Sequence, residues 1–290
     1  ADLTVARIRA LEARDILEVG CGLGLLALRL LPECRSYVGS DFSRSALDPL
    51  AANIPEDQKD QVQLHCCEAK DFAAYQSRQF DVIVLNSVVQ YFPDVTYLLE
   101  TLAGAVSHLR PGGALFLGDV RNHELHAAFA TSLELNKDAA PPSIETLRAG
   151  VGSHLAKENE LLVSPRFFEQ LKGRFPQLTH VELLPKYDFS HRGIDNELFR
   201  YRYDVVLTVA GEMDRETVAE TTIDWRTRGF DAEYFRAQLA LGQQALCMTH
   251  VPDTRLTRDV KIASLLQAET AELAEPEPYA AEAAPATPAA

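Results

Sequence analysis

The segment from Ile16 to Leu30 constrains the fold more than any other part of this chain. A short apolar run containing Glu18 is followed by Gly20, Gly22 and Gly24, and then by an apolar stretch with the pattern of a helix. A strand, a glycine-rich turn and a helix form a unit that binds a ligand against the turn, because glycine lets the backbone bend sharply and lets a ligand approach closely.

The spacing of this turn indicates which ligand it suits. A dinucleotide site is typified by G-x-G-x-x-G, whereas here the third glycine comes two residues after the second. Glu18 lies two residues before the first glycine, where a carboxylate would repel a pyrophosphate but would attract an ammonium group. The turn therefore favours S-adenosylmethionine (SAM), and a nicotinamide dehydrogenase is the alternative.

Composition limits the class of protein. The chain has 290 residues, a formal net charge of -14 and no basic stripe, so we expect no nucleic-acid partner. No apolar run reaches the length of about 18 residues that a membrane span needs. None of the five cysteines has metal-ligand spacing, so reduced thiols in a cytoplasmic protein and no metal site are expected.

Strand and helix patterns alternate over the first 119 residues. Alternation of this kind predicts an α/β fold with a mostly parallel, doubly wound sheet. The expected strands are 15–19, 36–41, 62–67, 80–85 and 114–119, and the expected helices are 4–13, 24–31, 43–53 and 97–109. A turn is expected at 110–113, where Arg-Pro-Gly-Gly occurs.

The regular alternation of strand and helix patterns ends after residue 119. Helical patterns predict a lid at about 123–172, inserted after the fifth strand, and two paired strands at 181–186 and 204–209 complete a core over 1–211. We expect 212–272 to be a helical and strand extension packed on that core. Residues 273–290, rich in Ala, Pro and Glu, read as an interdomain linker, so the chain is expected to be a piece of a longer protein.

Polar residues follow the second, third and fourth expected strands. Asp41 lies about 20 residues beyond the glycine turn, where a carboxylate accepts hydrogen bonds from ribose hydroxyls. Glu68 and Ala69 are placed to meet an adenine edge, and Asn86 is expected near the transferable methyl group. These residues join Glu18 and the three glycines as the predicted cofactor site.

Four longer strings carry a resemblance to a known family. They are Asn86-Ser87-Val88-Val89-Gln90-Tyr91-Phe92-Pro93, Gly118-Asp119-Val120-Arg121-Asn122, Asn196-Glu197-Leu198 with Tyr201-Arg202-Tyr203-Asp204-Val205-Val206-Leu207, and, more weakly, Val251-Pro252-Asp253 with Arg255-Leu256. The chain resembles class I SAM-dependent methyltransferases, whose fold is a Rossmann-like seven-stranded sheet, and more narrowly the methyltransferase domains embedded in nonribosomal peptide synthetases and polyketide synthases.

That resemblance implies a role in natural-product biosynthesis. Domains of this family use SAM, release S-adenosylhomocysteine, and act on intermediates held as thioesters on the phosphopantetheine arm of an acyl or peptidyl carrier protein. Neighbouring domains of the same megasynthase would be further partners. The resemblance places Tyr91, Arg121, Asn122 and Asn196 in strings expected near the substrate.

Two positions bear on which atom is methylated. N-methylating members of the family usually carry His where this chain has Asp195, and His123 follows the Arg121-Asn122 pair. An alcohol is a poor nucleophile and needs a base. We therefore expect O-methylation of a β-hydroxyl on a carrier-bound acyl thioester, with His123 as base and Glu197 as its orienter.

Several alternatives stay open at this point. The first is N-methylation of a carrier-bound aminoacyl thioester, the next is C-methylation, and a catalytically inactive methyltransferase fold is the third. His126 and His191 are the other candidate bases, and His123 has the competing interpretation of a solvated residue that begins a helix.

Overall fold

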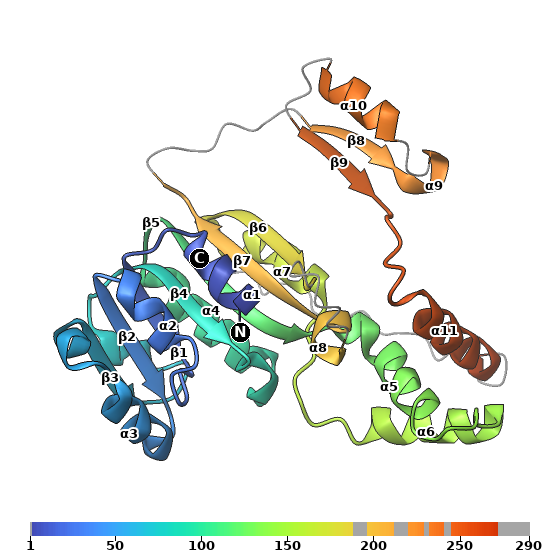
Figure 1. The fold of residues 1–290 in the computed structure, drawn as a ribbon, viewed down its shortest axis with the longest axis horizontal. Helices are drawn as coiled ribbons and strands as arrows, with labels where there is room; N and C mark the ends of the chain where they lie inside the picture. Colours follow the sequence, from blue (N-terminus) through green and yellow to red (C-terminus); the bar gives the residue numbers. More distant parts are fainter. Residues whose placement is uncertain (1, 188–195, 212–219, 229–231, 241–244, 272–290) are drawn as a thin grey trace, which may run out of the picture. The chain divides into compact units, whose positions relative to one another are not determined.

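A seven-stranded sheet forms the centre of the computed structural model (Figure 1). The structure describes residues 2–187, 196–211, 220–228, 232–240 and 245–271. The strand order is β3-β2-β1-β4-β5-β7-β6, with β7 antiparallel to both neighbours and the other strands parallel. The predicted seven-stranded, doubly wound sheet is therefore confirmed.

The strand bounds agree closely with the expected ones at the start of the chain. The strands are β1 (Asp15–Val19), β2 (Ser36–Asp41), β3 (Val62–Cys66), β4 (Phe80–Asn86), β5 (Leu109–Arg121), β6 (Leu178–Pro185) and β7 (Arg202–Val209). Because β1 is buried along its whole length between β2 and β4, its carboxyl end meets two neighbouring strand ends. Such a meeting point is where open α/β sheets bind ligands.

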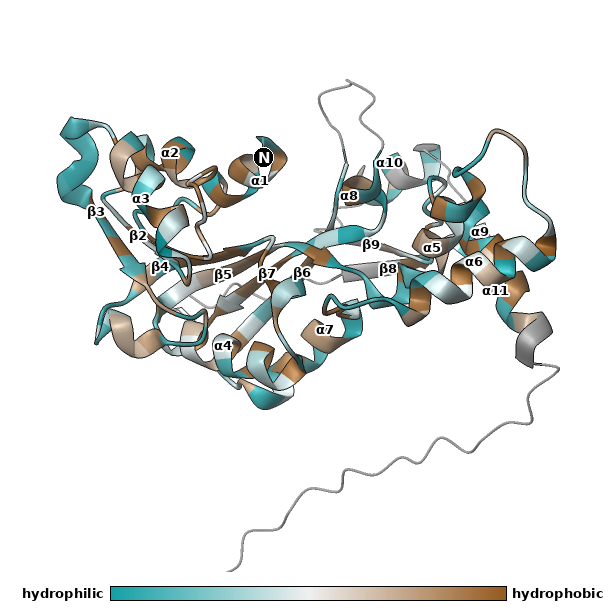
Figure 2. Ribbon diagram, turned by 90° about the horizontal axis from the view of Figure 1, so that it is seen from below, coloured by the Kyte–Doolittle hydropathy of each residue, from teal (hydrophilic) through white to brown (hydrophobic). Residues whose placement is uncertain are grey.

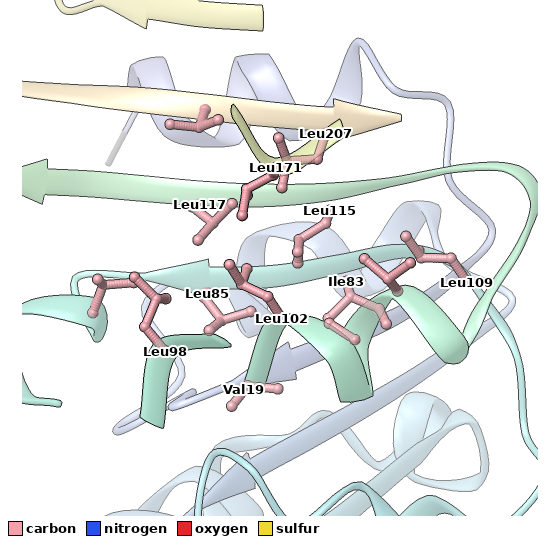
Figure 3. Close-up of a cluster of buried hydrophobic side chains, with 14 of the residues drawn as sticks. Val19, Ile83, Leu85, Leu98, Leu102, Leu109, Leu115, Leu117, Leu171 and Leu207 are labelled. Carbon is pink, nitrogen blue, oxygen red and sulfur yellow. The ribbon is translucent and has the colours of Figure 1, made fainter. Parts of the chain in front are cut away.

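One face of the sheet is covered by two helices, α4 (Val95–Ser107) and α7 (Pro165–Arg174). Figure 3 shows the leucines that fill this layer, with Leu98 and Leu102 from α4 and Leu171 from α7 packed against strand residues. The alternation of strand side chains directs Leu85 and Leu117 to this face. α7 is thus part of the core, although the sequence placed 165–172 within the lid.

The opposite face is covered by the helices nearest the N-terminus. They are α1 (Asp2–Arg9), α2 (Ala27–Leu30) and α3 (Arg44–Asn53), and they share a second core cluster with Ile16, Val84 and Phe116. In Figure 2 the hydrophobic colour runs along the central strands, whereas the helices alternate between hydrophobic and hydrophilic residues. Helices on both faces account for the near-continuous apolar runs of β1 and β4.

The predicted turn at 110–113 is wrong. These residues belong to β5, and the pairing of β4 with β5 shifts its register between Phe80 and Val82. Gly112 has φ +77°, which only glycine adopts at little cost, and its N–H donates to the carbonyl of Ala210. The glycine therefore makes an irregularity inside a strand rather than the start of one.

The rest of the chain divides differently from the predicted boundaries. Among the described residues, 127–156 and 254–271 belong to one compact unit, and the others belong to a second. In the smaller unit, α5 (His126–Leu135), α6 (Ile144–Ala156) and α11 (Thr257–Ala271) share a small core containing Ala130, Val151 and Leu266. The last helix thus packs with the helices expected to form the lid, and a lid function for them stays a prediction.

A second, two-stranded sheet follows the core. It consists of β8 (Glu220–Asp224) and β9 (Ala245–Thr249), which are parallel, and it is accompanied by α9 (Trp225–Arg228) and α10 (Ala232–Ala240). A single turn of helix, α8 (Glu197–Arg200), precedes β7. The linker expected at 273–290 lies outside the described residues.

Candidate active site

The glycine turn after β1 adopts the conformation that its sequence predicts. Gly20, Gly22 and Gly24 have φ values of +75°, +50° and +83°. A side chain at Gly20 would collide with Val88, and one at Gly24 would collide with Leu50. A side chain at Gly22 would meet nothing within 4 Å, so the backbone there borders open space that a ligand can occupy.

Asp41 ties the end of β2 to this turn. Its Oδ2 accepts a hydrogen bond from the Gly22 N–H at 3.0 Å, and its Oδ1 accepts one from the Ser43 N–H at 2.9 Å. Each carboxylate oxygen retains a lone pair, because a carboxylate has about four acceptor sites. Asp41 also lines the cavity beside the turn, so it can accept hydrogen bonds from ligand hydroxyls.

A cavity of about 410 Å³ lies at the carboxyl ends of β1 to β4. The predicted residues Gly20, Asp41, Glu68, Ala69 and Tyr91 all line it. Further residues also line it, which are Val19, Phe42, Cys67, Ser87, Val88, Phe92, Pro93 and Tyr97. Ser87, Val88, Phe92 and Pro93 belong to the string that carries the family resemblance, whereas the sequence interpretation missed Val19, Phe42 and Cys67. Several of them are aromatic or aliphatic neighbours of predicted residues, and adjacency to a strand end is the signal that would have found them.

Glu18 lies beneath the glycine turn rather than in the cavity wall. Its side chain is buried and accepts a hydrogen bond from the Tyr37 hydroxyl. Burial raises the pKa of Glu18 to about 8, and the hydrogen bond from Tyr37 opposes this only in part. A nearby ammonium group would lower that pKa again by favouring the ionised form.

Asn86, predicted to face the cofactor, turns toward the neighbouring strand. Its Oδ1 lies over Gly118 of β5, in the space that a side chain at 118 would need, and its Nδ2 is 3.2 Å from the Ser87 hydroxyl. Among the described residues nothing donates a hydrogen bond to this buried Oδ1. Asn86 thus holds Ser87, which does line the cavity.

The predicted pair of His123 and Glu197 does not form. His123 is exposed in a short 3-10 helix after β5, and the Glu197 carboxylate lies 3.6 Å from the Arg202 guanidinium. The two residues come from separate loops whose relative positions local patterns do not determine. His126 is largely buried, with its Nδ1 3.7 Å from Glu158, while His191 and Asp195 lie outside the described residues.

The other predicted substrate residues have structural partners. Asn122 accepts from the Glu124 N–H at 2.9 Å, and Asn196 accepts from the N–H groups of the residues two and three positions later. Asparagine at such positions begins helices, which explains both residues without a ligand. Arg121 pairs with Glu158 at 2.7 Å and Glu160 at 2.8 Å.

Two negative observations apply to the described part of the chain. No group of three His, Cys, Asp or Glu side chains there is placed to hold a metal ion. No helix in the same part has the length and apolar character needed to cross a membrane.

Comparison with known proteins shows which class of protein this chain belongs to. Residues 17–115, which contain the turn and the four strand ends, match the family model described as a methyltransferase domain. This chain is a SAM-dependent methyltransferase. Its sheet order and its glycine turn are those of the class I fold that the sequence resembles.

Several relatives of the methyltransferase are named nonribosomal peptide synthetases. It is 42% identical over 272 residues to chondramide synthase cmdD of Chondromyces crocatus, covering 91% of this chain and 7% of the relative. It is 32% identical over 244 residues to enniatin synthase of Fusarium equiseti, covering 80% of this chain and 8% of the relative. The methyltransferase therefore matches a small region of each.

A solved structure of the methyltransferase domain of bacterial CtHen1 is also similar. The identity is 17%, the TM-score is 0.49, and the match covers 72% of this chain and 96% of that one.

The residues of the cavity fit SAM. Gly22 does not line the cavity itself, but its open side next to Asp41 leaves room for backbone contact, and the spare lone pairs of Asp41 suit ribose hydroxyls. Aromatic faces attract cations, and Phe92 and Tyr97, whose ring centroids are 4.8 Å apart, border the same space as Tyr91.

Proposed function

We propose that the methyltransferase methylates the amino nitrogen of an aminoacyl or peptidyl thioester carried by a nonribosomal peptide synthetase. The observation that carries this proposal is the cavity itself: among its described lining residues, the ionisable carboxylates are Asp41 and Glu68, both on the β2–β3 side, and no imidazole is present. A neutral amine has a lone pair ready to react, whereas an alcohol needs a base that accepts its proton.

The O-methylation expected from the sequence depended on a His123–Glu197 pair. His123 is exposed and Glu197 lies beside Arg202, so that expectation has lost its structural support. The relatives favour the amine as well, since a peptide synthetase by name joins amino acids, whose nucleophile is nitrogen.

Some residues of the site would bind SAM and others would orient the reacting amine. The glycine turn and Asp41 would hold the ribose and the amino-acid portion of SAM, and Glu68 and Ala69 would border the adenine. When bound, SAM supplies an electrophilic methyl group. The Ser87–Val88 wall and Tyr91 would then limit how the amine approaches, which is a proximity effect.

Partners follow from this assignment. A carrier protein would deliver the thioester on its phosphopantetheine arm, and the neighbouring domains of the synthetase would supply the amino acid and consume the N-methylated product. The exposed Tyr91 and Phe42 at the rim of the cavity offer apolar contact for such an arm.

The decisive experiment is a mass-spectrometric assay with SAM and two carrier-bound substrates. One carries an aminoacyl thioester and the other a β-hydroxyacyl thioester of the same carbon skeleton. We expect the mass of one added CH2 on the aminoacyl arm alone. An added CH2 on the hydroxyacyl arm alone would overturn N-methylation and would point to the histidines after β5 as candidate bases.

The Asp41→Ala variant is the control for this assay. It should transfer little methyl at SAM concentrations that saturate the wild type, because the ribose acceptor is gone. A gain that persists in this variant at low SAM would mean that the cavity next to Asp41 is not where SAM binds.

A further inference from the structure

Two residues other than glycine adopt left-handed backbone conformations side by side at the edge of the cavity. Ser87, directly after β4, has φ +58°, and Asp119, near the end of β5, has φ +66°. The Ser87 hydroxyl donates a hydrogen bond to Asp119 Oδ2 at 3.0 Å. Such backbone strain persists only where the surroundings impose it, and it concentrates at functional sites.

Backbone hydrogen bonds hold both residues in place. The N–H of Ser87 donates to the carbonyl of Gly118 at 3.0 Å, which ties the end of β4 to β5. The N–H of Asp119 donates to Asp204 Oδ1 at 2.8 Å, and Asp204 is fully buried in β7. The left-handed pair is therefore anchored by three neighbouring strands.

Cations surround the Asp119 carboxylate. Lys186 Nζ lies 2.8 Å from Asp119 Oδ1 and 3.2 Å from Asp204 Oδ1, and Arg202 Nη1 lies 3.2 Å from Asp119 Oδ2. Arg7 of α1 completes the group at 2.5 Å from Asp204 Oδ2. We call Arg7, Ser87, Asp119, Lys186, Arg202 and Asp204 the Asp119 network.

These cations keep Asp119 ionised. Burial by itself would raise the pKa of Asp119, but the charges of Lys186 and Arg202 and the hydrogen bonds from Lys186 and Ser87 outweigh it and hold the pKa below its ordinary value. An ionised carboxylate is a stronger acceptor for the Ser87 hydroxyl than a neutral one.

The wall that Ser87 begins reaches the glycine turn. Val88 follows Ser87, lines the cavity, and occupies the space that a side chain at Gly20 would need. Sheet order places this wall on the β4 side of β1, whereas Asp41 stands on the β2 side. The two sides of the turn are thus held by different carboxylates, Asp41 for one and Asp119 for the other.

We infer that Asp119 is a positioning residue for methyl transfer, which acts by holding the left-handed Ser87 and through it the Ser87–Val88 wall of the cavity. This inference rests on the proposed function, because it assigns the wall to the orientation of the reacting groups. Asp119 itself is not among the residues that line the cavity.

The test compares methyl-transfer rates with SAM affinities in Asp119→Asn, Ser87→Ala and the double variant. We expect each single variant to lower the single-turnover rate about tenfold or more, since small misplacements of reacting groups are costly. SAM affinity measured by calorimetry should stay within about twofold, and the double variant should be no slower than the slower single variant. Multiplying effects, or an unchanged rate, would overturn the inference.

Asp81→Asn is the matched control. Asp81 accepts hydrogen bonds from the N–H groups of Arg14 and Asp15 and lies 2.5 Å from Arg110, but it stands at the opposite end of the sheet. It should lower the melting temperature and leave the rate unchanged. If Asp119→Asn changes the rate no more than Asp81→Asn does, its role is structural and the inference fails.

Ser87→Gly keeps the test decisive if Asp119→Asn does not fold. Glycine accepts the left-handed conformation, so this variant loses the hydroxyl without added strain. A slowed rate in a stably folded protein supports the inference, and a normal rate overturns it. All rates are measured on whichever carrier-bound substrate the wild type methylates, so a failure of N-methylation would show in the wild type and a failure of this inference only in the variants.

Discussion

The two ends of the central sheet carry similar ions in different settings. At the end where β1 begins, Asp15 pairs with Arg35 and Arg110, and Arg110 also reaches Asp81. At the end where β5 finishes, Asp119 pairs with Lys186. The Arg35 side chain is 68% exposed, whereas the Lys186 side chain is 8% exposed.

This difference in exposure separates two uses of the same chemistry. The cations of the first cluster are open to water although its Asp15 carboxylate is buried, and ion pairs open to water add little to stability and are screened by salt. This cluster therefore fastens strand ends without constraining them tightly. Buried ions need partners, because a buried charge without one is strongly destabilising. The left-handed Ser87 and Asp119 and the cavity occur at the buried end.

The largest effect is expected at the cavity end. Asp41→Ala should weaken SAM binding by roughly 10- to 100-fold, because it removes a charged acceptor of hydrogen bonds. Calorimetric titration with SAM measures this directly, and Asp41→Asn should show a smaller loss because one amide oxygen can still accept. If Asp41→Ala leaves the affinity for SAM unchanged, the end of the sheet next to Asp41 does not bind the cofactor, and the two ends do not differ in function.

A smaller effect, on stability alone, is expected at the opposite end. Arg110→Ala removes a partner from both Asp15 and Asp81, at a cost of about 1 kcal/mol, since the guanidinium is partly exposed. Thermal unfolding should show a melting temperature lower by roughly 2–4 °C. SAM affinity should match that of the wild type, and a parallel loss of affinity would show that the two ends are coupled.

Glu18, between the two ends, predicts a pH dependence. Its pKa in the folded protein is about 8, above its ordinary value of 4.5, so between these values the folded protein holds a proton that the unfolded chain has released. The free energy of unfolding therefore falls as the pH rises through this range. Glu18→Gln has no proton to lose, so its melting temperature should fall less between about pH 5 and pH 8. Parallel curves for the two proteins would contradict this assignment.

The smallest effect is expected at His123. Because this residue is exposed and separate from Glu197, His123→Ala should transfer methyl to an aminoacyl thioester within about twofold of the wild-type rate. Single-turnover assays give the value. A loss of tenfold or more would restore His123 as a base and would extend the functional end of the sheet to the loop after β5.

Local patterns predicted the cofactor half of the molecule well. β1 and β2 begin and end where expected, and the glycine turn and Asp41 meet because consecutive strands pair in register. Chemistry that depends on neighbours close in the chain is visible in this way. Asn122 and Asn196 cap helices, and their role at the substrate stays a prediction, since helix caps and ligand contacts use the same side-chain oxygen.

The Asp119 network could not be predicted, because its members are distant in the chain. Asp119 meets Arg202 across 83 residues, and Arg7 meets Asp204 across 197. Nothing in the sequence around Asp119 indicates which cations will reach it. The turn expected at 110–113 failed for a related reason, since the strand extends across it through the pairing of Leu109 with Phe80 of β4, and the Gly112 N–H reaches the carbonyl of Ala210, just after β7.

Arg7 pairs with a residue 197 positions later in the chain, and this separation affects the order in which the structure can form during synthesis. The ribosome releases the glycine turn, Asp41 and Ser87 before Lys186, Arg202 and Asp204 exist. During that interval Asp119 lacks Lys186 and Arg202, and Arg7 of α1 lacks the Asp204 carboxylate of β7. The nascent chain can therefore assemble the nucleoside side of the cavity early, while the wall beside β4 takes its final form only after β7 joins the sheet.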